Sequence, residues 1–315
     1  MDEIAGFLDG PRARGAFLLR AVMEPPWALS IEDEAPLAVV VMVSGEAWVV
    51  RPEGRHHLVA GDIALVRGPE HYLFAGSPTT PVQVRIRPGQ ICETPEGVSV
   101  SAELALGLRS WGNSRDGSAE MVIGVYEADG EISRRLTEAL PPVVALTSAA
   151  WSSRVLPLLL DEVGRDGPGQ QVVLDRLLDL LVIDALRAWF ARPDAATPQW
   201  YAAQADPVVG PALRLLHSQP EAPWTVAGLA RQVGVSRAAL ARRFNDVVGE
   251  PPMGYLTGWR LAVAADLLLE PDASVGSVSR RVGYGSPFTF STAFKRAYGH
   301  SPKAHRASAQ RRAAG

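Results

Sequence analysis

The chain has few of the features that mark exported or membrane proteins. It contains one cysteine, Cys92, so it cannot form an intrachain disulfide. It begins with Asp2 and Glu3, where an export signal would be basic and then apolar. Its most apolar stretch, 172–190, is interrupted by charged side chains: Asp175, Arg176, Asp179, Asp184 and Arg187. Because a membrane-spanning helix cannot readily bury such charges, we expect a cytoplasmic protein with no membrane partner.

Low-complexity tracts are also absent, and the composition is that of a folded protein. Apolar residues make up 47% of the chain and charged residues 21%. A length of 315 residues exceeds what one hydrophobic core usually serves, which predicts two domains.

The net charge of −3 hides an asymmetry between the two parts of the chain. Residues 205–315 hold 14 Lys and Arg against 7 Asp and Glu, so this part carries +7 and the remainder −10. A basic module joined to an acidic one is typical of nucleic-acid binding, although basic surfaces also serve solubility.

The N-terminal part reads as a β-domain. Short apolar runs separated by Gly and Pro predict strands, at Leu37–Val43, Ala47–Val50, Asp62–Val66 and Val82–Ile86. The runs lie too close together for crossover helices, so we expect a largely antiparallel sheet at about 15–140, folded into a sandwich or barrel that could hold a small ligand.

Helical periodicity follows the strands. Apolar segments at 149–163 and 170–192, separated by the Gly/Pro-rich turn 166–169, predict a helical hairpin at about 146–192. The second helix is apolar on more than one face, which fits either packing within one chain or a homodimer through 170–192. The Pro-containing stretch 193–205 is predicted to be a linker.

The clearest functional signal lies at 226–247. Small Ala230 permits a close helix crossing, Gly234 suits the left-handed backbone at a helix end, and Ser236 can cap the next helix. Leu240 and Phe244 would enter a shared core. This pattern predicts a helix-turn-helix unit, although any helical hairpin can place a Gly between its helices.

The same pattern recurs about fifty residues later, at 274–297. Residues 236–244 match 286–294 in length, and the intervening 252–269 reads as one continuous helix. Two recognition helices held by one spacer could enter successive major-groove segments about 34 Å apart, without needing a dimer.

Residues 206–307 resemble the DNA-binding domain of the AraC family of transcription regulators. The positions that carry the resemblance are Ala230, Gly234, Ser236, Arg242, Phe244, Gly249, Pro251, Pro252, Tyr255, Arg260, Ala264, Leu267, Leu268, Val282, Gly283, Tyr284, Phe290, Phe294, Lys295, Gly299, Ser301, Pro302 and Arg306. The resemblance implies an all-α domain with two helix-turn-helix units, and double-stranded promoter DNA as the partner.

The resemblance also implies which side chains meet DNA. Base-facing positions would be Arg237, Ala238, Ala241 and Arg242 in the first unit, and Pro287, Phe288, Ser291 and Thr292 in the second. Arg242 suits bidentate guanine readout, whereas Thr292 stands where many relatives carry Arg. Phosphate-facing positions would be Ser236, Arg243, Arg260, Ser286, Lys295 and Arg296, although salt bridges would equally explain Arg243 and Arg260.

The first domain is expected to span 1–192, and residues from about 5 to 190 resemble the cupin-type sensor domain found in a large subgroup of the same family. The landmarks are Pro26-Trp27, 45–48, Gly61-Asp62 and 67–71. Metal-binding cupins gather several His ligands, but a His-x-His strand is missing near Val40 and only His71 stands in a matching place. We therefore expect no metal and no cofactor.

An effector cavity in this domain would draw on its aromatic side chains, which ordinary core packing would also explain: Trp27, Trp48, His71, Tyr72 and Trp111. Some relatives carry a cysteine near Ile123-Gly124, which this chain lacks. Cys92 could sense oxidants if exposed, but a lone cysteine is more often a small buried hydrophobe.

These features predict a DNA-binding regulator without catalytic residues. By analogy with the family, we expect it to respond to an unknown small molecule, to activate rather than repress, and to have RNA polymerase as a candidate partner. The alternatives are a cupin enzyme fused to a DNA-binding tail, a DNA-repair or thiol-transfer fusion, and a regulator whose N-domain is only a dimerisation scaffold.

Overall fold

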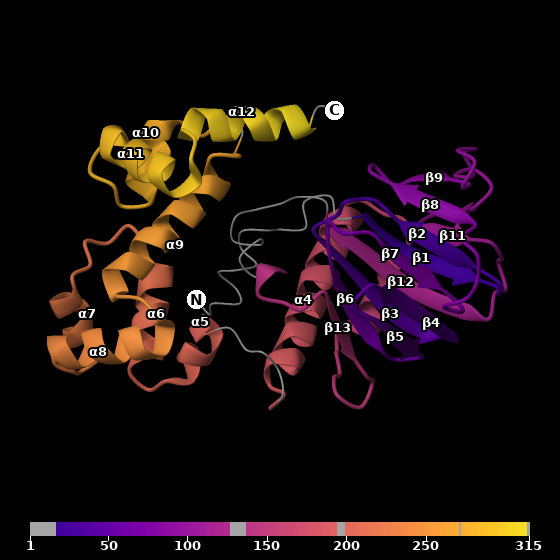
Figure 1. The fold of residues 1–315 in the computed structure, drawn as a ribbon, viewed down its shortest axis with the longest axis horizontal. Helices are drawn as coiled ribbons and strands as arrows, with labels where there is room; N and C mark the ends of the chain where they lie inside the picture. Colours follow the sequence, from indigo (N-terminus) through magenta and orange to yellow (C-terminus); the bar gives the residue numbers. More distant parts are fainter. Residues whose placement is uncertain (1–16, 127–136, 194–198, 271, 314–315) are drawn as a thin grey trace. The chain divides into compact units, whose positions relative to one another are not determined.

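The computed structural model describes residues 17–126, 137–193, 199–270 and 272–313 (Figure 1). The chain divides into two compact units. Among the described residues, the first unit holds 17–126 and 137–193 and the second holds 199–313.

The first unit contains two β-sheets. The seven-stranded sheet has the order β10 (Ala105–Gly107), β11 (Ser110–Gly112), β1 (Phe17–Met23), β12 (Ala119–Tyr126), β3 (Leu37–Ser44), β6 (Ile63–Arg67) and β13 (Val143–Leu146). The six-stranded sheet has the order β5 (Gly54–Val59), β4 (Glu46–Arg51), β7 (Tyr72–Ala75), β2 (Ala28–Ile31), β8 (Val84–Arg87) and β9 (Ile91–Glu93). The β1–β11 and β2–β8 pairs are parallel and the other pairs of described strands are antiparallel, which confirms the largely antiparallel expectation.

The core of this unit lies between the two sheets. Alternate residues of β4 point inward, so Ala47 and Val49 join one cluster with Met121 of the opposite sheet. The described strands form two separate hydrogen-bonded sheets, so the barrel is not closed and the arrangement is a cupin-like sandwich. The strand expected at Val82–Ile86 begins later, at Val84.

A helical hairpin follows β13, but its first helix is shorter than expected. Helix α3 spans Leu156–Val163, whereas 149–155 form turns and irregular backbone. Trp151 is buried and its indole donates to the Gly61 carbonyl at 3.0 Å, which fastens this segment to the β-domain. Pro157 has no backbone N–H and disfavours a helical residue before it, so it fits only in the first turn.

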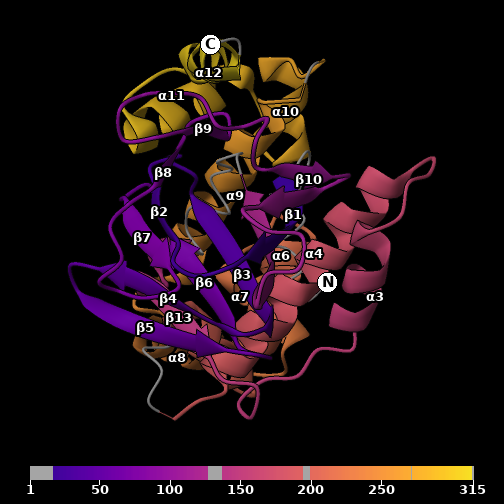
Figure 2. The same cartoon turned by 90° about the vertical axis from the view of Figure 1, so that its right-hand side faces the viewer.

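Helix α4, Gln170–Phe190, packs on the outer face of the seven-stranded sheet (Figure 2). Leu178 occupies the space that a side chain at Gly124 would need, since a Cβ there would lie 2.7 Å from a Leu178 methyl carbon. The hydroxyl of Tyr126 donates to the buried carboxylate of Asp179 at 3.1 Å. One wide face of the helix is therefore covered by its own β-domain.

The second unit is helical. Its elements are α5 (Gln199–Ala202), the 3₁₀ turn η1 (Ala203–Ala205), α6 (Val209–Ser218), α7 (Val226–Gln232), α8 (Arg237–Val248), α9 (Pro252–Leu267), α10 (Val275–Arg281), α11 (Pro287–Tyr298) and α12 (Pro302–Ala313). The stretch 199–205, expected to be linker, instead forms α5 and η1. Ala203 is fully buried and α5 contacts α8, so this segment belongs to the second unit.

Helix α9 connects the two halves of the second unit. Its N-terminal part meets the first half, where Tyr255 packs edge-on against Phe244 with ring centroids 5.7 Å apart. Its C-terminal part meets the second half, where Leu261 and Ala265 share a cluster with Phe290. A single helix therefore fixes the position of α8 relative to α11.

Candidate nucleic-acid interface

Helices α7 and α8 form a helix-turn-helix unit with both helix starts capped. The Thr225 hydroxyl accepts from the Gly228 amide, and the Ser236 hydroxyl accepts from the Ala239 amide at 3.1 Å. Gly234 between the helices has a φ of +73°, which an L side chain adopts only with strain. The first helix is thus closed and the second begun within a few residues.

Helices α10 and α11 repeat this arrangement. Ser274 and Ser277 cap the start of α10 reciprocally, and Ser286 accepts from the Thr289 amide at the start of α11. Gly283, with φ of +82°, takes the place of Gly234. Buried Ser279 stands where the first helix-turn-helix unit has Ala230.

The two turns are closed by the same backbone hydrogen bond but differ in length. The amide of Val235 donates to Ala230 at 3.0 Å, and that of Tyr284 donates to Ser279 at 2.8 Å. One residue, Val235, separates Gly234 from the cap Ser236, whereas two residues separate Gly283 from Ser286. The second recognition helix therefore starts one residue later relative to its turn.

The exposed face of α8 carries unpaired cations. Arg237, Ala238 and Arg242 are exposed and Ala241 is half-buried, while Leu240 on the opposite face is fully buried. Within the part of the chain that the structure describes, neither Arg237 nor Arg242 forms a hydrogen bond or an ion pair. Both guanidinium groups are therefore available to an external partner.

The equivalent face of α11 borders a shallow, open depression on the surface. Its lining residues are Phe288, Ser291, Thr292, Lys295, Arg296 and Ser301. Pro287 precedes them, exposed, in the first turn, and Ser286 is occupied as the cap. The residues predicted from the sequence to face DNA in the second helix-turn-helix unit thus lie together on one side of α11.

Two of the arginines predicted to meet phosphates are engaged within the protein. Arg243 forms an ion pair with Asp206, with Nη2 2.8 Å from the carboxylate. Half-buried Arg260 donates to the carbonyls of Pro220 and Ala222 at 2.6 and 2.8 Å, and burial lowers its pKa. Arg260 therefore supports the loop beneath the second turn, where a side chain at Gly283 would collide with it. Both arginines therefore have partners within the protein, as the salt-bridge alternative expects for Arg243.

Sequence reasoning did not single out Asp206 or His217. Asp206 precedes α6 and accepts from the amides of Val208 and Val209, a capping position that its place before a helical pattern could have indicated. His217 is buried, stacks on Trp259 at 4.1 Å and pairs with the Tyr255 hydroxyl at 2.6 Å. Only the folded structure brings these rings together.

The five aromatic residues considered for an effector cavity do not converge. Trp27 is buried in the core between the sheets, and Tyr72 and Trp111 pack against the same core. Trp48 lies on the opposite face of its sheet, stacked on His57 with ring centroids 4.4 Å apart, and His71 is exposed. The structure therefore does not gather these residues around one cavity.

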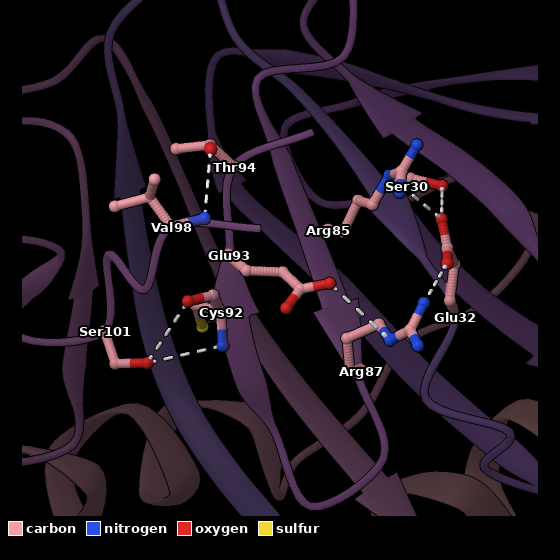
Figure 3. A network of polar contacts seen from close by, with 9 residues as sticks. All are labelled: Ser30, Glu32, Arg85, Arg87, Cys92, Glu93, Thr94, Val98 and Ser101. Carbon is pink, nitrogen blue, oxygen red and sulfur yellow. Dashed lines mark hydrogen bonds and ion pairs between the residues drawn. The ribbon is translucent and has the colours of Figure 1, made fainter. Parts of the chain in front are cut away.

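Cys92 lies in β9 beside a network of charged side chains (Figure 3). Glu32 pairs with Arg87, and Arg87 also approaches Glu93, all on one face of the sheet edge. Because side chains alternate along a strand, Cys92 lies on the face opposite Glu93, where it is 7% exposed. Burial raises the pKa of its thiol, and this effect is larger than that of the hydrogen bonds with Ser101 and Trp111, which lower it. A buried thiol with a raised pKa is a poor nucleophile.

Among the residues that the structure describes, His, Cys, Asp and Glu do not gather in groups of three or more that could hold a metal ion. None of the described helices combines the length and apolar character needed to cross a membrane.

Comparison with known proteins follows the division into two units. Residues 2–191 match the Cupin family, and residues 229–308 match the family described as a helix-turn-helix domain. The Cupin match covers more than half of the chain.

Curated relatives match from about half to four fifths of the chain. An AraC-like transcription regulator of Streptomyces lividans is 31% identical over 79% of each chain, and one of Streptomyces antibioticus is 34% identical over 67% of this chain and 70% of its own. The regulator AlkR of Acinetobacter baylyi is 34% identical over 56% of this chain and 60% of its own.

Among solved structures, the DNA-binding domain of the transcriptional factor AdpA, determined in complex with a target DNA, is 33% identical. It covers 34% of this chain and 96% of its own, with a TM-score of 0.32. With a cupin domain, two helix-turn-helix units and relatives named as regulators along most of its length, this chain belongs to the AraC family of DNA-binding transcription regulators.

Proposed function

We propose that this regulator reads a promoter with the outward faces of α8 and α11, held one behind the other by α9. The observation that carries the proposal is the unpaired cationic face of each recognition helix. Arg237 and Arg242 on α8, and Lys295 and Arg296 on α11, have no polar partner among the described residues, whereas Arg243 and Arg260 do. Ser236 and Ser286 present helix N-termini, which favour phosphate.

Within this proposal, Arg237 and Arg242 contact base edges and Ala238 and Ala241 lie against the groove floor. A guanidinium can donate two parallel hydrogen bonds to guanine O6 and N7, which makes Arg242 the principal discriminator. Lys295 and Arg296 neutralise phosphates, which position the protein without reading sequence.

The acidic N-terminal unit supplies regulation in this proposal. The family resemblance favours a response of this unit to a small effector, and activation through contact with RNA polymerase. The location follows from the partner, because a promoter-binding protein acts in the cytoplasm of a bacterial cell.

We further propose that two chains associate through α4. The face of α4 turned away from the sheet exposes apolar side chains, with Val172 61%, Val173 44% and Leu180 47% exposed. Exposed aliphatic side chains at helical spacing favour a partner helix, since their transfer from water contributes about 25 cal/mol per Å². A second copy offers the same face in a two-fold arrangement.

The test is selection of fragments from random or genomic DNA by the full-length protein, followed by binding of the recovered site at several salt concentrations. We expect one shared motif with two elements about one helical turn, roughly 34 Å, apart. The logarithm of affinity should fall linearly with that of salt concentration, with a slope of several units, because phosphate contacts release counterions. Failure to enrich any sequence, or an affinity independent of salt, would contradict the proposal.

A further inference from the structure

The two recognition helices differ in chemistry at equivalent positions. Their caps, Ser236 and Ser286, and their buried Phe244 and Phe294 fix the alignment of α8 with α11. When the two helices are aligned residue by residue, Pro287 and Thr292 of α11 stand at the positions of Arg237 and Arg242 in α8. The base-facing side of α11 thus carries neither a guanidinium nor a carboxamide, the groups that make bidentate bonds to purines.

Phe288 is the most unusual residue on this face. Its side chain is 82% exposed, the highest value among the exposed large hydrophobic residues of the described chain. It occupies the position of Ala238, and it is held there by the Ser286 cap and by Pro287 in the first turn. The start of α11 therefore presents a large apolar ring to solvent. Exposing this ring to water is unfavourable, and contact with a partner would remove that unfavourable exposure.

The polar neighbours of Phe288 offer limited base recognition. The Thr292 hydroxyl donates to the Phe288 carbonyl at 3.1 Å, so its proton is already used within the helix. Ser291 lines the same depression and is half-buried. Single hydroxyl groups can bond to any base pair, so they discriminate less than a bidentate contact.

Cations flank Phe288 along the same face. Lys295 and Arg296 line the depression with it, whereas the equivalent positions of α8 carry Asn245 and Asp246. An apolar contact bordered by two unpaired positive charges suits a polyanion whose groove exposes an apolar group. In the major groove, that group is the C5-methyl of thymine.

We propose that Phe288 reads a thymine methyl group in the second element of the operator, so that α8 discriminates by hydrogen bonds and α11 by apolar contact. This inference rests on the proposed function and adds the class of base that α11 selects. With 82% of its side chain exposed, Phe288 contributes little to the buried core of the second unit.

The test replaces each thymine of the selected site, one at a time, with deoxyuridine, which removes only the methyl group. Full-length wild type and Phe288→Ala are titrated against every site by fluorescence anisotropy, with Phe288→Leu as an apolar control. Burying one methyl group contributes about 0.8 kcal/mol, so wild type should lose about fourfold affinity at one or two positions. At those positions Phe288→Ala should bind the thymine and deoxyuridine sites with equal affinity. Phe288→Leu should retain part of the difference between them.

Other outcomes overturn the inference in distinguishable ways. Equal affinities of wild type and Phe288→Ala would show that the ring does not contact DNA. A loss in Phe288→Ala that is the same for thymine and uracil would indicate a wedge that deforms the duplex instead of a methyl contact. In both cases Arg242→Ala would still weaken binding if the proposed function holds, and circular dichroism establishes that each variant is folded.

Discussion

Arg243 of α8 donates to both carboxylate oxygens of Asp206, which precedes α6. The Nε atom of Arg243 lies 2.8 Å from Oδ2 and 3.0 Å from Oδ1 of Asp206. The same carboxylate caps α6 through the amides of Val208 and Val209, both at 2.9 Å. One side chain therefore joins the start of α6 to the first recognition helix, and it gives Arg243 an ionic partner within the protein.

Acid should weaken this connection in a defined range. The Arg243 hydrogen bond lowers the pKa of Asp206 from 3.8 to about 2. A carboxylate with a depressed pKa contributes stability that is fully present above about pH 4 and is lost as the pH falls toward 2. We expect Asp206→Ala to lower the free energy of unfolding by about 1 kcal/mol at neutral pH, measured by chemical denaturation.

The matched variant for this prediction is Asp206→Asn, which keeps a capping oxygen but loses the charge. It should lose less stability than the alanine variant at neutral pH. Between about pH 4 and pH 2, the free energy of unfolding should also fall less for Asp206→Asn than for wild type, because the variant has no carboxylate to protonate at this position. Identical acid profiles for wild type and Asp206→Asn would show that the pair with Arg243 does not govern this titration.

Replacing Arg242 should change base preference rather than affinity alone. We expect Arg242→Ala to cost about 1 to 3 kcal/mol at the selected site and to flatten the preference at one base position. Arg214→Ala is the control, because Arg214 is an exposed arginine of α6, outside both helix-turn-helix units, and lacks a polar partner among the described residues. Anisotropy titrations on the site and its single-base variants measure both. An equal loss on every sequence would make Arg242 a phosphate contact.

Cys92 should react slowly in the folded protein. Because burial raises the pKa of its thiol, the thiolate fraction at neutral pH is below that of a free cysteine. We expect a thiol reagent to modify Cys92 much more slowly in the native than in the denatured chain. Cys92→Ala should bind DNA like wild type before and after peroxide treatment. A peroxide response that only Cys92→Ala lacks would restore the redox-sensor hypothesis.

Association through α4 can be tested with a pair of leucines of matched exposure. Leu180 on α4 is 47% exposed, and Leu108 in the β-domain is 50% exposed. Sedimentation of the full-length chain should give a dimer for wild type and Leu108→Glu, and a shift toward monomer for Leu180→Glu. A charge buried against a partner helix without an opposite charge is costly, whereas one facing solvent is tolerated. A monomeric wild type, or a dimeric Leu180→Glu, would exclude this interface.

Local patterns were sufficient for the architecture because they depend on neighbouring residues. A short, continuous apolar run at 37–43 predicted β3, and Gly234 followed by Ser236 predicted the end of one helix and the start of the next. Its repetition around Gly283 made the DNA-binding family recognisable. A left-handed backbone and a cap are short-range requirements, so residue order alone reveals them.

What the sequence by itself determined is thus the class of protein, its two kinds of domain and its two helix-turn-helix units. Only the tertiary structure decided which arginines are free, since Asp206 and Arg243 are 37 residues apart and meet only after folding. It also set Trp48 and Trp27 on opposite faces of one sheet and left the Phe288 ring exposed. Pairing and burial depend on contacts between distant segments, which periodicity and composition do not encode.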